Sequence, residues 1–221
     1  MNQKRLVYLI IFLISCQVFL SNCKKKNDSL IISGIAINKE TWQPVQGMNV
    51  LLSARTISNG TWSSQFNSID NQLTSSDGSF NFKFDNIRAS DFKLTFQKAG
   101  YISDEYIIQP NLLVPGKDYH QNYLVHFESW LKIMIKNYSP SSVNDVLSYR
   151  LLKGSLNCPN GCNDSLKYLF GANVDTYHLC KLHGSQNAII EWNYSNNTGN
   201  SQHIDTIWIV PSDTTFYNIY Y

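Results

Sequence analysis

The chain has 221 residues, of which 13% are aromatic and 15% are charged. So few Glu, Lys and Arg side chains argue against a helical bundle and favour many short strands joined by polar turns. The 18 basic and 16 acidic side chains give a formal net charge of +2, which argues against nucleic acid as a partner, because such partners are bound by strongly basic surfaces.

The first 22 residues have the layout of an export signal. Lys4 and Arg5 precede an apolar segment over residues 6–20, and the small polar pair Ser21-Asn22 follows it. Fifteen helical residues reach about 22 Å, short of the roughly 30 Å hydrocarbon layer of a bilayer. We therefore predict a cleaved leader, with an uncleaved N-terminal anchor as the alternative. Cleavage leaves 199 residues with 16 basic and 16 acidic side chains.

The predicted cleavage site, residues 20–23 (LSNC), resembles a bacterial lipobox. The resemblance implies that the Cys23 thiol receives a diacylglyceryl group, that the chain is cut before Cys23, and that the new amino group is acylated. Asn22 departs from the usual Gly, Ala or Ser. Three acyl chains are enough for durable anchoring. No Asp follows Cys23, which favours the outer membrane, on its periplasmic or cell-surface face, with residues 23–29 as a lipidated tether.

Strand patterns begin at residue 30 and continue to about residue 112. The Asp77-Gly78 pair is typical of a tight turn. Phe80, Phe82 and Phe84 then alternate with polar residues, which predicts a strand with one apolar face. The same alternation recurs at Phe92, Leu94 and Phe96.

This order of elements resembles a carboxypeptidase-regulatory-like domain. The resemblance implies a seven-stranded, transthyretin-like β-sandwich over residues 30–112 that is a non-catalytic accessory. The matching segments are the strand at Gly34, Pro44-Val45, residues 47–50, Asp77-Gly78-x-Phe80 and Lys98-x-Gly100-Tyr101.

The sequence pattern of the remaining chain predicts a second β-sandwich domain. Residues 113–127 hold proline, glycine and polar residues and are predicted to be a connector. Alternation resumes at Leu131, Ile133 and Ile135, and residues 128–221 are predicted to form a second β-sandwich of unassigned family. The predicted fold is therefore all-β, with two consecutive antiparallel β-sandwiches after the leader.

Three cysteines stay available after processing, namely Cys158, Cys162 and Cys180. An oxidising compartment favours a disulfide, with Cys158–Cys162 across a Pro-Asn-Gly turn as the first pairing and Cys162–Cys180 as the second. The alternative is tetrahedral zinc bound by Cys158, Cys162, Cys180 and His183, with His178 as a substitute. We predict no resident metal and no cofactor.

No catalytic motif is present. None of the five histidines begins an H-x-x-E or H-E-x-x-H motif, and the chain has neither a G-x-S-x-G elbow nor a phosphate-binding loop. We therefore predict a membrane-anchored, non-enzymatic envelope lipoprotein that acts as a structural or protein-interaction module. The alternative is a glycan-binding accessory that uses a loop aromatic, Trp62, because exposed rings stack on sugar faces.

Overall fold

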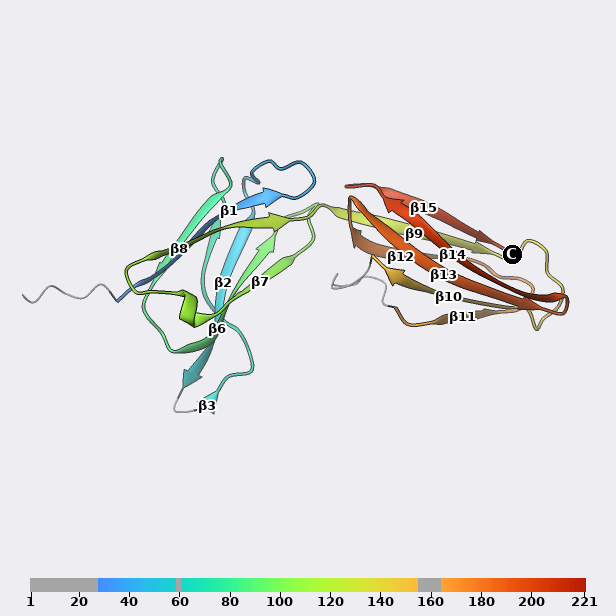
Figure 1. Ribbon diagram of the computed structural model, residues 1–221, viewed down its shortest axis with the longest axis horizontal. Helices are drawn as coiled ribbons and strands as arrows, with labels where there is room; N and C mark the ends of the chain where they lie inside the picture. Colours follow the sequence, from blue (N-terminus) through green and yellow to red (C-terminus); the bar gives the residue numbers. More distant parts are fainter. Residues whose placement is uncertain (1–27, 59–60, 155–163) are drawn as a thin grey trace, which may run out of the picture.

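The computed structural model describes residues 28–58, 61–154 and 164–221, which form two β-sandwiches joined end to end (Figure 1). This confirms the predicted all-β fold of two sandwiches. The first domain contains β1 (Leu30–Asn38), β2 (Asn49–Ser58), β3 (Thr61–Trp62), β4 (Asn67–Leu73), β5 (Ser79–Phe84), β6 (Ala89–Gln97), β7 (Asp104–Ile108), the 3-10 helix η1 (Pro110–Leu112) and β8 (Asp118–Val125).

Two sheets face each other in the first domain. One has the order β5-β1-β8, and the other is built around β2, which pairs with β3, β4 and β6, while β6 pairs with β7. Strand β1 lies antiparallel to β5 and parallel to β8, so Ile32 is opposite both Phe82 and Tyr119. The parallel pair is an addition to the antiparallel pairing expected from the sequence.

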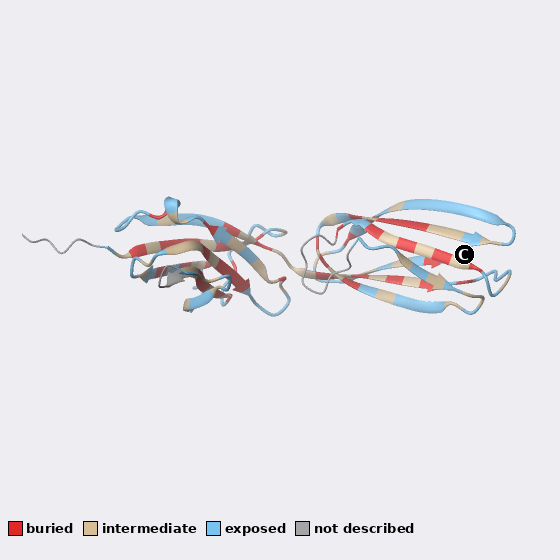
Figure 2. Cartoon of the chain, turned by 90° about the horizontal axis from the view of Figure 1, so that it is seen from below, coloured by how far each residue is buried: buried red, intermediate tan, exposed pale blue. Residues whose placement is uncertain are grey.

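Aromatic side chains fill the space between these sheets. Phe80 and Phe82 are buried, as the alternation after Asp77-Gly78 predicted, while Phe84 is partly buried and packs against the core. Phe96 lies at the centre of a ring cluster, with centroids 5.7 Å from Phe80 and 5.2 Å from Tyr123. Buried residues line the inner faces of both sandwiches in Figure 2.

The prediction that residues 113–127 form a connector is wrong for most of this segment. Residues 118–125 form strand β8, and Tyr123 and Val125 are buried in the first core. The first half of β8 is largely exposed and polar because β8 lies at the edge of its sheet. A polar edge strand has no apolar alternation, so the sequence pattern there is the same as that of a loop.

The described residues of the second domain form seven strands with a separate core. They are β9 (Glu128–Lys136), β10 (Val146–Lys153), β11 (Lys167–Phe170), β12 (Asp175–His183), β13 (Gln186–Asn196), β14 (Gly199–Ile209) and β15 (Thr214–Tyr220). One sheet has the order β12-β9-β15 and the other β11-β10-β13-β14. Strand β15 lies parallel to β9, and all other pairs are antiparallel.

Alternation along these strands separates a buried face from an open one. Leu131, Ile133 and Ile135 are at most 1% exposed and meet Ile190 and Ile219 in one cluster. Successive side chains of a strand point to opposite faces, so the residues between them lie on the outer faces of the domain. Within the described residues, no helix has the length and apolar character needed to cross a bilayer.

Candidate functional site

The two domains meet at a very short link. Strand β8 ends at Val125 and β9 begins at Glu128, so only His126 and Phe127 lie between them. The first domain holds this link from one side: Ile102 N donates to His126 O at 2.9 Å, and Glu128 N donates to Gly100 O at 2.9 Å. A link this short with satisfied backbone groups restricts the motion of one domain against the other.

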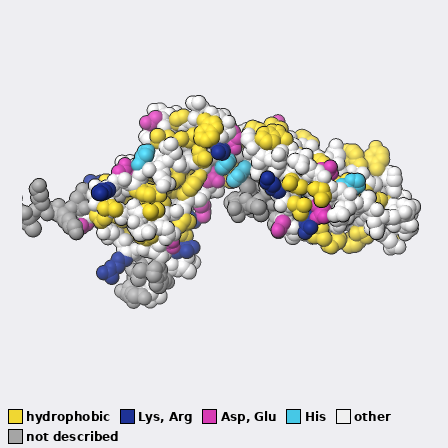
Figure 3. Space-filling model, in the orientation of Figure 1, with side chains coloured by type: hydrophobic (Ala, Val, Ile, Leu, Met, Phe, Trp, Pro, Cys, Tyr) yellow, Lys and Arg dark blue, Asp and Glu magenta, His cyan; other side chains and the backbone are white. Residues whose placement is uncertain are grey.

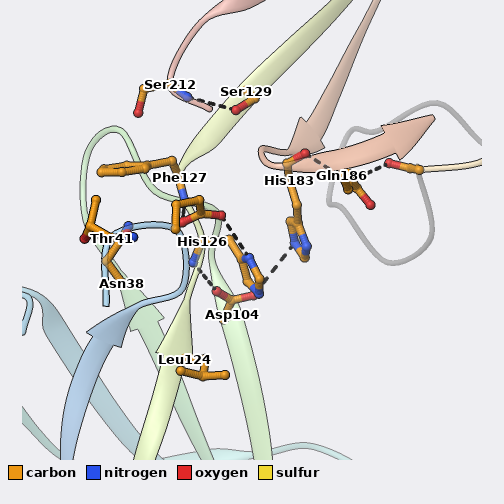
Figure 4. A network of polar contacts seen from close by, with 12 residues as sticks. Asn38, Thr41, Asp104, Leu124, His126, Phe127, Ser129, His183, Gln186 and Ser212 are labelled. Atoms are coloured by element: carbon orange, nitrogen blue, oxygen red, sulfur yellow. Dashed lines mark hydrogen bonds and ion pairs between the residues drawn. The ribbon is translucent and has the colours of Figure 1, made fainter. Parts of the chain in front are cut away.

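Two carboxylates of the first domain bind the link, and Figure 4 shows one of them, Asp104, beside His126. Asp104 Oδ2 accepts the backbone N–H of His126 at 3.1 Å. Glu40 Oε2 accepts the backbone N–H of Phe127 at 3.3 Å, and Glu40 Oε1 lies 3.2 Å from His126 Nδ1. The Glu40 side chain is only 3% exposed, so these contacts compensate for the removal of its charge from water.

The second domain contributes His183, the last residue of β12. Its ring stacks on that of His126, with centroids 4.2 Å apart and planes 3° apart. Its Nε2 lies 3.9 Å from Asp104 Oδ1. We call Glu40, Asp104, His126 and His183 the junction cluster. It joins the two cores through polar contacts.

Burial shifts two titrating groups of the junction cluster. It lowers the pKa of His183 from 6.5 to about 4, and the neighbouring His126 acts in the same direction. Burial also raises the pKa of Asp104, against the opposing effect of His126. Desolvation disfavours a charged form, so it lowers the pKa of a base and raises that of an acid. His183 is therefore neutral at pH 7.

The pKa of His183 predicts a pH-dependent stability. Since its pKa is higher in the unfolded chain, the unfolded state binds more protons between pH 6.5 and about 4. The free energy of unfolding should therefore fall as the pH is lowered through this window. The raised pKa of Asp104 acts in the opposite direction, since protonation of Asp104 then favours the folded chain.

A His183→Gln variant isolates the histidine contribution. Urea unfolding from pH 7 to pH 4 should show a steeper loss of stability in the natural chain than in the variant, because glutamine does not titrate. If the free energy of unfolding fell equally with pH in the two chains, the lowered pKa of His183 would be contradicted.

A cavity of about 290 Å³ lies beside the junction cluster. Its lining includes Lys39, Glu40, His126, His183 and Gln186. Both oxygens of Glu40 already contact the link, Oε2 at the backbone N–H of Phe127 and Oε1 at the ring Nδ1 of His126. Among the residues the structure describes, no three His, Cys, Asp or Glu side chains are placed to hold a metal ion. The contacts of the junction cluster join the first domain, the link and the end of β12.

Most residues singled out from the sequence fall elsewhere. Cys23, Cys158 and Cys162 lie outside the described residues, so the lipid on Cys23 stays a prediction. Of the two expected disulfide pairings, only the second, Cys162–Cys180, includes Cys180, and Cys180 is disulfide-bonded. The backbone of Trp62 pairs with Ile57 in the short strand β3, and its side chain also lies outside what the structure describes.

The zinc alternative does not fit the part of the set that is described. Cys180 is fully buried and disulfide-bonded, so it has no thiolate to offer a metal. Cys180 and His183 are three residues apart in β12 and point to opposite faces of the sheet. His183 contacts His126 instead, and the substitute His178 lies 3.2 Å from the hydroxyl of Tyr149.

The sequence analysis did not find the junction cluster. Its four residues come from the turn after β1, the start of β7, the link and the end of β12. The four residues do not form a sequence motif with a regular spacing, and only the pairing of distant strands brings them together.

No protein-family model matches this sequence, and no curated protein matches it. Among solved structures, the chain is similar to a streptococcal ancillary pilin, with 11% identity and a TM-score of 0.31 over 88% of this chain and 63% of that one. It is also similar to the shaft pilin SpaA from Lactobacillus rhamnosus GG, with 9% identity and a TM-score of 0.30 over 87% and 96%.

A dioxygenase domain from the cellulolytic bacterium Streptomyces sp. SirexAA-E has 14% identity and a TM-score of 0.34 over 48% of this chain and 84% of that one. Similarity at this level concerns the β-rich architecture alone.

Proposed function

We propose that the chain is a non-enzymatic envelope lipoprotein that acts as a structural and protein-interaction module. The observation that carries the proposal is the end-to-end arrangement of the domains. The described chain enters the first domain at the end away from the second (Figure 1), and the junction cluster holds the two together. A lipid on Cys23 would therefore present the second domain away from the membrane surface.

The second domain offers a surface suited to a protein partner. On the outer face of the β12-β9-β15 sheet, Tyr177, Phe216 and Tyr220 are each more than half exposed. Lys132 Nζ lies 4.4 Å from the ring centroid of Tyr177 and 5.8 Å from that of Phe216. We call Lys132, Tyr177, Leu179, Phe216 and Tyr220 the aromatic–lysine face.

Large exposed rings are typical of protein interfaces. Hydrophobic side chains reach the surface over the second domain in Figure 3. Three parts of the proposal rest on the sequence alone. They are the absence of enzymatic activity, the outer-membrane location and the carboxypeptidase-regulatory-like assignment of the first domain. The alternative, a glycan-binding accessory that uses Trp62, also rests on the sequence.

Photo-crosslinking in intact cells tests the proposal. A benzoylphenylalanine at position 216 should give a discrete adduct with an envelope protein. An aromatic ring at the centre of a protein interface becomes buried in the complex and lies in van der Waals contact with the partner. The same probe at position 107 is the matched control, since Ile107 is also about half exposed but lies in the first domain. No adduct at 216, or equal adducts at both positions, would contradict the interaction role.

A Cys23→Ala chain tests the anchor separately. It keeps both domains but should stay an unlipidated precursor that still carries residues 1–22, and it should lose the adduct. An intact mass that shows lipid on this variant would contradict the lipidation of Cys23.

A further inference from the structure

The outer face of the other sheet in the second domain carries a polar groove. Two neighbouring rows of side chains cross all four strands of the β11-β10-β13-β14 sheet. One row runs Phe170, Val146, Ser195, Asn200, and the next runs Tyr168, Ser148, Asn193, Gln202. All eight lie on the face opposite Leu147 and Trp192, which belong to the core.

The six residues on β10, β13 and β14, together with Tyr194 and Ser201, line an open cavity of about 420 Å³. We call them the amide groove: Val146, Ser148, Asn193, Ser195, Asn200 and Gln202. Small serines in the middle of the sheet leave a depression, and the longer amides of Asn200 and Gln202 lie beside it on the edge strand β14. Its polar side chains are hydroxyls and amides, which both donate and accept hydrogen bonds.

Two exposed aromatic rings border the amide groove on the opposite side. Tyr168 and Phe170 lie two residues apart on β11 and point to the same face. Their ring centroids are 6.2 Å apart and their planes differ by 17°. Tyr168 is 54% exposed and Phe170 is 70% exposed, so both rings are available to a ligand in the groove.

The charges next to the amide groove compensate one another. Arg150 Nε donates to Glu191 Oε2 at 2.6 Å, and Gln202 Nε2 donates to Glu191 Oε1 at 2.9 Å. Both carboxylate oxygens of Glu191 are thus engaged, and the row beside the groove has no net charge. A strongly anionic or cationic ligand finds no opposite charge here.

We propose that the amide groove binds a neutral oligosaccharide chain, with Tyr168 and Phe170 as its stacking platform. One face of a pyranose ring presents C–H bonds of slight positive charge, which are attracted to the negative face of an aromatic ring. The hydroxyl groups at the sugar's edges need both donors and acceptors, which the amides and serines supply. The groove is open across the sheet and accommodates a polymer as well as a chain end.

This proposal differs in residues and in place from the aromatic–lysine face. That face lies on the opposite sheet and combines rings with the ammonium group of Lys132. The sugar site also differs from the one expected at Trp62, because it lies in the second domain. The failure of either proposal therefore leaves the other standing.

Affinity electrophoresis of the full chain tests the proposal. Native gels contain hydroxyethylcellulose, galactomannan or amylopectin as neutral polymers, or alginate as an anionic one, in a polyoxyethylene detergent that carries no sugar. We expect at least one neutral polymer to retard the chain and alginate to have no effect. A Tyr168→Ala/Phe170→Ala chain should bind about tenfold more weakly, because truncation of ring anchors typically costs that much affinity.

The matched control is a Tyr177→Ala/Phe216→Ala chain, which removes two similarly exposed rings from the opposite sheet. It should bind as the natural chain does. Asn193→Asp is a second test, since it keeps the size of the side chain and removes its N–H donors, and it should also weaken binding. No retardation by any neutral polymer, retardation by alginate alone, or equal losses in the two double variants would overturn the proposal.

Discussion

Replacing Phe96 by alanine should destabilise the first domain by about 4 kcal/mol. Phe96 is 0% exposed and packs edge-on against Phe80 and Tyr106, with ring centroids 5.7 Å away in both cases. Alanine removes the ring from the middle of this cluster and leaves a cavity that the two hydrogen-bonded sheets cannot collapse to fill. The loss is therefore near the upper end of the range for core truncations.

Differential scanning calorimetry measures this effect domain by domain. The two cores share no residues, so the transition of the first domain should move to lower temperature while that of the second changes little. Leu73→Ala is the control, because Leu73 is 69% exposed in the same domain and its truncation should cost less than about 0.5 kcal/mol. Similar shifts in both variants would mean that Phe96 does not occupy the core.

Replacing Gly34 by valine should cost about 3 kcal/mol for a different reason, which is overpacking. A Cβ at position 34 would lie 2.4 Å from the backbone oxygen of Gln121 and 2.5 Å from a ring carbon of Tyr123. Both neighbours belong to β8, which is hydrogen-bonded in parallel to β1. The Tyr123 ring is itself fixed among Phe80, Phe96 and Tyr106, so the clash is relieved only by separating the two strands.

Hydrogen exchange of the β8 amides reports this separation directly. Protection over residues 118–125 should fall in Gly34→Val, since opening of the strand pair exposes these groups to water. Ile35→Val is the control on the opposite face of the same strand; it removes one methylene and should change the free energy of unfolding by less than about 1 kcal/mol. Unchanged protection in Gly34→Val would contradict the close approach of β1 and β8.

The parts of the fold that depend on local patterns were predictable. The alternation at Phe80 and Phe82 is a property of neighbours in the chain, and both residues are buried as expected. The need for glycine at position 34 was not predictable in this way, because it comes from Tyr123 on a distant strand, which leaves no room for a side chain there. The parallel place of β8 beside β1 was not predictable, since its partner lies more than 80 residues away and its own first half is polar.

The sequence by itself determined that this protein is all-β, that it has two domains and where their central strands run. These features follow from the period of two that a half-buried strand imposes on its own residues. Only the tertiary structure decided which residues share a site. It brought Glu40, Asp104, His126 and His183 to one junction and aligned Tyr168 and Phe170 with the amide groove. Strand order and register are set by pairing between distant segments, and that pairing leaves no local period in the chain.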